Sequence, residues 1–489
     1  MLKAAARLQP LDLDLARETY LSAWGAAVMA GHLADAGNLR EVSRAARVVP
    51  APAHPPRSTD LLLDGLALAV TDGLAAAAPA LRQAVASFTS ADTPVEERLR
   101  WSWLAPMAAE YLWDADSWLA ISAGAVQLAR DVGALDQLPI SLQAQAVVVT
   151  WCGDFPAATA LITEGRLVCE ATGTLMAPIA VMQLAAMRGR ESEAVPLIEA
   201  VFAAATAGGQ GTVVTWTRWA TAVLCNVLGR YSDAAAAARQ ASQDMPEITV
   251  SSWALPELIE AAARTGDSRL AAGALDKLAE TTQPGGTDWG LGIEARGCAL
   301  LSAGRAAEDR YREAIDRLGR TRLRPDLARA HLLYGEWLRR ENRRTDAREQ
   351  LRTAHDQLSA IGMEAFAERA RRELLATGET ARKRTAQPAV AASQELTPQE
   401  AQVARLARVD DVKLAVRQPL VQEAGVDRRH RRIASAGEDL HRGAYPRQQV
   451  GQHWKLSRVG TQVANRLGEP VSPVVTISLL RVCGRRPLP

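Results

Sequence analysis

Basic side chains near the C-terminus are the residues of this sequence best suited to chemistry, and that chemistry would be the binding of a polyanion. Residues 409–489 carry 14 Lys and Arg against 7 Asp and Glu, while the rest of the chain is slightly acidic. In the segment 447–470, "RQQVGQHWKLSRVGTQVANRLGEP", two short helices joined by a turn would place Arg458, Thr461 and Arg466 on or beside the second helix. A helix of this kind can enter the major groove of DNA. We therefore predict Arg458, Thr461 and Arg466 as DNA-binding residues.

A second basic run, "DRRHRR" at residues 427–432, can contact phosphate groups through charge alone, without reading a base sequence. Charged runs also occur as solvated tails that bind nothing. Both interpretations of residues 409–489, contact with nucleic acid and a solvated tail, stay open on the sequence.

Residues that could support catalysis or hold a metal do not form a known motif. The seven His are scattered, and the sequence contains no H-E-x-x-H, no C-x-x-C and no G-x-S-x-G. It also contains no G-x-x-x-x-G-K-[ST] segment that would hold the phosphates of a nucleotide. We predict that the protein is not an enzyme and has no catalytic residues, no metal and no cofactor.

The cysteines and the hydrophobic segments indicate the cellular compartment. The five Cys are odd in number and widely spaced, which favours reduced thiols over a disulfide framework. The N-terminus turns acidic too early for a signal peptide, and no apolar stretch approaches the length of a membrane span. We expect a cytoplasmic protein without membrane contact.

The composition favours helices as the elements that position these residues. Hydrophobic residues make up 48% of the chain and aromatic residues only 4%, so Ala, Leu and Val carry the apolar content. Ala and Leu lose little side-chain entropy in a helix, and runs of β-branched residues bounded by turns are scarce. The expected fold class is all-α.

A repeat of about 38 residues organises the chain. The strings "GDFPAA", "GRESEA", "GRYSDA", "GDSRLA", "GRAAED" and "NRRTDA" begin at residues 153, 189, 229, 266, 304 and 342, with spacings of 36, 40, 37, 38 and 38. Weaker members, "GHLADA", "GLAAAA" and "DADSWL", begin at residues 31, 73 and 114. Gly and Asn can adopt the left-handed conformation that ends a helix, and the polar residues that follow can start the next one.

Each repeat therefore predicts a helical hairpin. In five of the six strings Ala stands five residues after the leading Gly or Asn, where it would let two helices approach closely. In the last unit Ala347, Leu351 and Ala354 fall on one side of a helix, and a single hairpin cannot bury that side alone. The pattern resembles tetratricopeptide repeats with longer turns, and we interpret residues 1–375 as one TPR-like α-solenoid that serves as a sensor or interaction array.

Tryptophan is unusually frequent, with 12 Trp against 4 Phe. One interpretation is a groove lined by indole rings that holds a ligand or a partner, for which Trp216, Trp219, Trp253 and Trp289 are the candidates. The alternative is that these rings pack between helices.

A linker and the start of a second domain follow the array. Residues 376–394, "ATGETARKRTAQPAVAASQ", are rich in Thr, Ala, Gln and charge, which predicts a flexible linker. In residues 395–408, "ELTPQEAQVARLAR", Thr397 can cap a helix that begins at Pro398, and Glu400 completes a capping box.

This start resembles the first helix of the LuxR-type helix-turn-helix domain. The preceding segments "GTDWGLGIEARGCALLSAG" and "RLRPDLARAHLLYGEWLRRENRRTDAREQLRTAH" resemble the sensor array of large, MalT-like LuxR regulators. The resemblance covers residues 1 to about 408 and is strongest from about residue 250. It implies a transcriptional regulator that binds DNA and that senses a small-molecule inducer or a regulatory protein through its helical array; a homo-oligomer is one possible assembly. The N-terminal NTPase domain of the family has no counterpart in this sequence.

The resemblance stops after Arg408. The family continues with a Gly turn, an N-x-E-I helix and a T-V-x-x-H recognition helix, whereas this chain reads "VDDVKLAVRQPLVQEAGVDRRHRR". We therefore expect an incomplete helix-turn-helix domain, with residues 409–489 as a basic tail without the family pattern. So abrupt a change is what a shift of reading frame produces. The competing hypothesis is a TPR-like adaptor that binds protein partners and no DNA.

Overall fold

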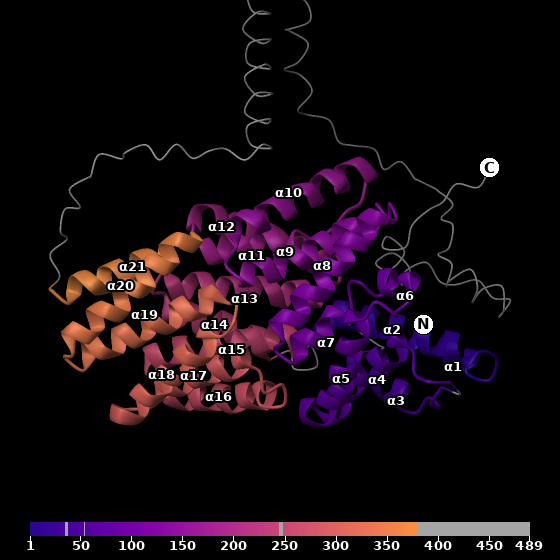
Figure 1. Ribbon diagram of the computed structural model, residues 1–489, viewed down its shortest axis with the longest axis horizontal. Coiled ribbons are helices and arrows are strands. Elements are labelled where there is room, and N and C mark those ends of the chain that lie inside the picture. The colour runs from indigo at the N-terminus through magenta and orange to yellow at the C-terminus, as the bar shows by residue number, and fades with distance from the viewer. Residues whose placement is uncertain (35–37, 53, 244–247, 379–489) are drawn as a thin grey trace, which may run out of the picture. The chain divides into compact units, whose positions relative to one another are not determined.

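The computed structural model describes residues 1–34, 38–52, 54–243 and 248–378, and within these ranges the regular secondary structure is entirely helical (Figure 1). The all-α prediction is confirmed for this part of the chain. The elements are α1 (Leu2–Leu8), α2 (Leu13–Ala30), the 3-10 helix η1 (Gly31–Leu33), α3 (Leu39–Arg47), α4 (Ser58–Asp72), α5 (Leu74–Thr89), α6 (Val95–Arg100), α7 (Pro106–Tyr111), α8 (Ala115–Asp131), α9 (Leu138–Trp151), α10 (Phe155–Thr172), α11 (Ile179–Arg188), α12 (Glu191–Ala207), α13 (Gly211–Val227), α14 (Tyr231–Ser242), α15 (Ile248–Thr265), α16 (Ser268–Thr282), α17 (Asp288–Leu301), α18 (Gly304–Gly319), α19 (Arg324–Arg340), α20 (Arg344–Ile361) and α21 (Glu364–Ala376).

The turns predicted from the repeat are present. All six turn residues have a positive φ, between 55° and 80°: Gly153, Gly189, Gly229, Gly266, Gly304 and Asn342. A helix begins at the turn residue or within two residues of it in every case. Asp154 and Asp267 cap α10 and α16, because each side chain accepts a hydrogen bond from a backbone N–H of the first turn. These positions therefore separate successive helices as the sequence indicated.

The alanines of the repeat lie where helices touch. Ala158, Ala194, Ala234, Ala271 and Ala347 are all fully buried. In the last pair of helices, a Cβ on Gly335 of α19 would lie 2.6 Å from Cγ of Leu351 on α20, which shows how closely these two helices pack. Leu351 and Ala354 are fully buried with Ala347, so the predicted apolar side of α20 faces the core.

Helices far apart in the sequence also contact each other. Thr212 donates a hydrogen bond to the backbone carbonyl of Val28, and Thr287 donates one to that of Trp113, across 184 and 174 residues. Arg190 pairs with Glu364 across 174 residues. At the level of whole helices, α2 contacts α13, α5 contacts α16 and α11 contacts α21. Contacts thus recur between helices about ten positions apart, in addition to those between neighbours.

Gly285 lies against the backbone of Leu112 in one of these long-range contacts. Replacing Gly285 tests how tightly that contact is packed. A Cβ there would lie 2.9 Å from the carbonyl carbon of Leu112 and closer still to the carbonyl oxygen, so the backbone itself would have to move. We expect Gly285→Ala to lower the free energy of unfolding by about 1–3 kcal/mol. Urea unfolding followed by circular dichroism would measure the loss.

Gly273, inside α16, provides the matched control. A Cβ on Gly273 would meet nothing within 4 Å. Gly273→Ala should therefore stabilise the protein slightly, because alanine favours the helix by roughly 0.5–1 kcal/mol over glycine. Equal effects of the two substitutions on the free energy of unfolding would show that the backbone around Gly285 can accommodate a Cβ without cost.

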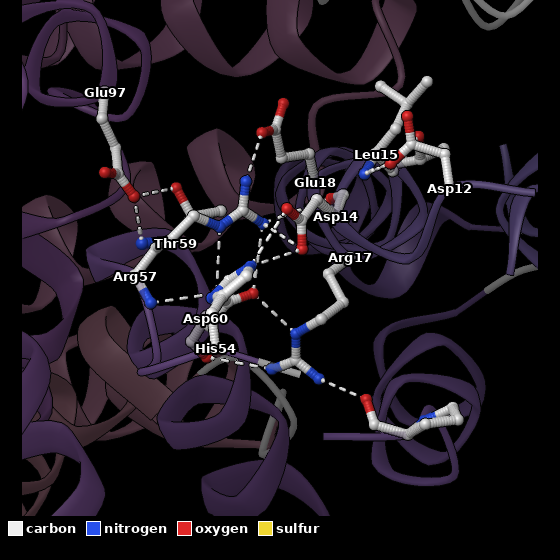
Figure 2. A network of polar contacts seen from close by, with 12 residues as sticks. Asp12, Asp14, Leu15, Arg17, Glu18, His54, Arg57, Thr59, Asp60 and Glu97 are labelled. Atoms are coloured by element: carbon white, nitrogen blue, oxygen red, sulfur yellow. Dashed lines mark hydrogen bonds and ion pairs between the residues drawn. The ribbon is translucent and has the colours of Figure 1, made fainter. Parts of the chain in front are cut away.

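Near the N-terminus, a network of ion pairs joins α2 to α4. Figure 2 shows Arg17 of α2 and Arg57, which precedes α4, both directed at Asp60. Arg17 Nε donates to Asp60 at 2.6 Å, and both side chains are buried. Arg57 also pairs with Glu18 at 2.9 Å. Burial disfavours the Asp60 carboxylate, but the two guanidinium groups lower its pKa, so the network remains charged.

The described residues end at 378, two residues after α21. The predicted linker at 376–394 begins at the last residue of α21, and nearly all of it lies outside the described residues, as do the segments 395–408 and 409–489. Within the described part of the chain, no helix is both long enough and apolar enough to cross a membrane.

Candidate functional site

The residues predicted from the sequence fall in two places. Arg458, Thr461 and Arg466, the predicted DNA-binding residues, lie outside the described residues. The capping residues Thr397 and Glu400 lie outside them as well. The four candidate tryptophans lie within the helical array.

These four indole rings are buried and contact one another or further tryptophans. Trp219, Trp253 and Trp289 are 1–2% exposed and Trp216 is 8% exposed. Trp253 lies 5.4 Å from Trp216 between ring centroids and is stacked on Trp118 at 5.5 Å. In this structure the indoles fill the space between α8, α9, α13, α15 and α17, which is the packing alternative, and they do not line an open groove.

A network of buried charges joins α15, α19 and α21. Three carboxylates and three guanidinium groups alternate along it, and we call it the charge chain: Glu257, Arg329, Glu260, Arg369, Glu336 and Arg264. Five of these side chains are at most 10% exposed, and the terminal Arg264 is 14% exposed. Charged side chains are seldom buried unless they are paired, so a network of six such side chains is unusual.

The first half of the charge chain connects α15 to α19. Arg329 donates two hydrogen bonds to Glu257, at 2.6 and 2.9 Å, in the bidentate arrangement that suits a guanidinium and a carboxylate. It also donates to Glu260 at 2.9 Å. The Arg329 guanidinium lies 4.9 Å from the ring centroid of Phe366 on α21, so an aromatic face covers it. Asn226 of α13 completes this half by donating to Glu257 at 2.8 Å.

The second half of the charge chain connects both helices to α21. Arg369 of α21 donates to Glu260 at 2.8 Å and makes two hydrogen bonds to Glu336 of α19, at 2.7 and 3.0 Å. Arg264, in the last turn of α15, pairs with the same Glu336 carboxylate. Arg369 therefore ties α21 to both α15 and α19 through buried ion pairs.

The charge chain is ionic despite its burial. Burial disfavours the carboxylate of Glu260, but Arg369 and Arg329 hold its pKa well below the usual range. Burial opposes the charge on Glu336 too, and Arg369 and Arg264 lower its pKa. Burial disfavours the guanidinium of Arg369, but Glu336 and Glu260 raise its pKa. Loss of any one member would leave at least one buried charge with one partner fewer.

Part of this network has a signal in the sequence. Glu257, Glu260 and Arg264 are spaced three and four residues apart, which places them on one side of α15. Arg329 and Glu336 are seven apart and lie on one side of α19 in the same way. Neither spacing shows that these sides face each other, because Arg329 meets Glu257 across 72 residues and Arg369 meets Glu260 across 109.

A groove adjoins the charge chain along α18, α19 and α20. It consists of two hollows with volumes of about 460 and 630 Å³, both lined by Arg312 and Arg343. Trp337 lines the first hollow and Tyr334 the second, and their rings are stacked with centroids 6.0 Å apart. The two rings flank Glu336 in the sequence, so the groove and the charge chain share α19.

Ion pairs order the wall of the groove. Glu308 of α18 accepts hydrogen bonds from Arg343 at 2.7 Å, from Arg312 at 2.6 Å and from Tyr334 at 3.0 Å. The hydrogen bond from Arg343 is the main reason that the pKa of Glu308 is lowered. Most of the residues that line the two hollows are charged or polar.

In residues 1–34, 38–52, 54–243 and 248–378, no three His, Cys, Asp or Glu side chains come together in a way that could hold a metal ion. The described cysteines, Cys152, Cys169, Cys225 and Cys298, are free thiols. Comparison of the chain with protein-family models and with curated proteins finds no match.

Proposed function

We propose that this protein is a cytoplasmic transcriptional regulator of the LuxR type, in which a helical sensor array precedes an incomplete C-terminal DNA-binding domain. One observation carries the proposal: the sequence "ELTPQEAQVARLAR", which resembles the start of a LuxR-type domain, follows an array of helices that repeats at about 38 residues. The order of the two parts is that of the large LuxR regulators, which the sequence resembles.

We further propose that the array is a TPR-like α-solenoid. The positive φ at six equivalent turns and the buried alanines that follow them support a hairpin repeat. Contacts between residues 174 and 184 positions apart support a superhelix that completes one turn in about ten helices, so that successive turns touch. The groove on α18–α20 is then the surface offered to a small-molecule inducer or a regulatory protein.

The charge chain provides a route from this groove to the C-terminal part. Tyr334 and Trp337 lie in the groove wall, and Glu336 between them holds Arg369 of α21, after which the described chain ends. A ligand that moved α19 would disturb the pairing of Glu336 with Arg369. A ligand shifts such an equilibrium only by its difference in affinity for the two arrangements.

DNA binding by the full chain, measured against salt concentration, tests the proposal. We expect the full chain to bind DNA with an affinity that falls steeply with salt, because each phosphate contact contributes a slope of about −0.9 to the plot of log K against log salt. A chain ending at residue 392 should show no such binding. If the two proteins behave alike, residues 393–489 do not contact DNA.

The second candidate is a helical-repeat adaptor, and the groove on α18–α20 favours it, because a groove on the helical array can bind a protein without any DNA. The adaptor should show no DNA binding at any salt concentration. Resequencing the gene from codon 390 adds an independent test. A neighbouring frame that encodes an N-x-E-I helix and a T-V-x-x-H helix directly after Arg408 would identify a regulator with a shifted frame.

A further inference from the structure

The groove on α18–α20 is lined by more carboxylates than guanidinium groups. Three arginines line its two hollows: Arg305, Arg312 and Arg343. Six carboxylates line the same hollows: Glu308, Asp309, Asp316, Glu341, Asp346 and Glu349. His331 also lines the groove, but burial lowers its pKa, so its imidazole adds no charge at neutral pH. The lining therefore carries three negative charges in excess.

Two of these carboxylates have no partner within the described part of the chain. Ion pairs engage all the other charged side chains of the lining: Arg312–Glu308, Arg343–Glu308, Arg343–Asp346, Arg305–Asp309 and Arg320–Asp316. The side chains of Glu341 and Glu349 are exposed, and among the described residues they make no hydrogen bond and no ion pair. Glu341 lines the first hollow and Glu349 the second, so each hollow offers one free carboxylate.

The described chain ends close to this groove. The carbonyl of Thr377 accepts a hydrogen bond from Arg348 of α20 at 2.8 Å, and its hydroxyl accepts one at 3.1 Å. Arg348 and the groove residue Asp346 point to opposite sides of α20, because they are two residues apart in a helix. The groove therefore lies about one helix diameter, roughly 10–12 Å, from the place where the described chain ends.

The sequence that follows contains a cationic run of matching charge. Residues 427–432, "DRRHRR", hold four Arg and one Asp, which leaves three positive charges in excess with the His neutral. The intervening residues 379–426 number 48, far more than are needed to pass around one helix. Glu349 lies roughly 8 Å along the axis from the start of α20, near Glu341, and five residues of chain can span that distance.

We propose that residues 427–432 bind in the groove on α18–α20 of their own chain, with arginines paired to Glu341 and Glu349. The inference rests on the proposed function, in that it takes this groove as the regulatory surface. Guanidinium groups suit the site because their planar N–H donors can bind both oxygens of a carboxylate. Arginines held in this way are unable to contact DNA phosphates, so a ligand that displaced them from the groove would free them to do so.

Calorimetric titration of a synthetic peptide into the full chain tests the inference. The peptide is residues 425–434, GVDRRHRRIA, and the variant carries Arg428→Gln, Arg429→Gln, Arg431→Gln and Arg432→Gln. In the wild type the attached segment competes with the peptide at an effective concentration of about millimolar. We expect the peptide to bind the variant at least tenfold more tightly than the wild type, because the variant has lost this competitor.

Substitutions in the groove locate the binding. Glu341→Gln and Glu349→Gln, added together to the variant, should weaken peptide binding at least tenfold. Glu280→Gln is the matched control, because Glu280 is an exposed carboxylate of α16 that does not line the groove, and it should leave binding unchanged.

Three results would overturn the inference: no binding of the peptide to the variant, equal binding to the variant and the wild type, or full binding after the loss of Glu341 and Glu349. Equal binding to the two chains would assign the groove to a basic segment of another protein. The titration contains no DNA, so its failure leaves the proposed regulator standing, and a failure of DNA binding leaves the peptide result intact.

Discussion

Replacement of Arg369 by Met is expected to lower the free energy of unfolding by about 3–5 kcal/mol, the usual cost of removing one partner from a buried ion pair. Arg369 holds Glu260 and Glu336 at once, and its loss would leave both buried carboxylates short of a cation. Much of the cost is therefore the desolvation of the remaining charges and not the loss of the hydrogen bonds themselves.

Urea unfolding of the full chain would measure this loss, with Arg371→Met as the matched control. Arg371 lies on the same helix and pairs with Glu368, but both side chains are well exposed, so its removal should cost under about 1 kcal/mol. Combining Arg369→Met with Glu336→Gln should cost less than the sum of the single changes, because they share one network. Equal losses of unfolding free energy at positions 369 and 371 would mean that a buried ion pair contributes no more to stability here than an exposed one.

Replacement of Trp253 by Ala, as a separate single substitution, is expected to lower the free energy of unfolding by about 3–5 kcal/mol. The ring is 2% exposed and contacts Trp118, Trp151 and Trp216 at centroid distances of 5.4–5.5 Å. Removing it would open a cavity between α8, α9, α13 and α15 that the surrounding rings can fill only in part.

Trp253→Phe tests the packing role at the same position. A smaller aromatic ring retains part of the contacts, so it should lose clearly less stability than alanine. Chemical unfolding monitored by the fluorescence of the remaining tryptophans would measure both variants. A loss below about 1 kcal/mol for Trp253→Ala would contradict a packing role and return this residue to the groove interpretation.

Features that depend only on neighbouring residues in the sequence, such as helix ends and the buried side of a helix, could be predicted. Gly153, Gly229 and Asn342 could be predicted as helix ends because a left-handed residue is chemically recognisable without knowledge of its surroundings. Ala347 and Leu351 could be assigned to a buried side of a helix because the spacing of apolar residues follows the helical period.

The charge chain could not be predicted in the same way, because its pairs form between helices that only tertiary packing brings together. Arg329 and Glu257 each look like an ordinary helix charge in the sequence, and burial alone makes them unusual. The tryptophans illustrate the opposite problem. Their abundance is visible in the sequence, but whether an indole lines a groove or fills a core depends on which helices surround it.

The contacts between helices ten apart bear on how the protein is made. An array in which each repeat touches only its neighbours can fold as it leaves the ribosome, one repeat after another. Here Val28 can contact Thr212, and Arg190 can contact Glu364, only after 174–184 further residues have been synthesised. Until then these surfaces of the N-terminal half remain uncovered. At about 5–20 residues per second, that interval lasts on the order of 10–40 s. The helix surfaces that these contacts cover therefore stay open on the nascent chain for that interval.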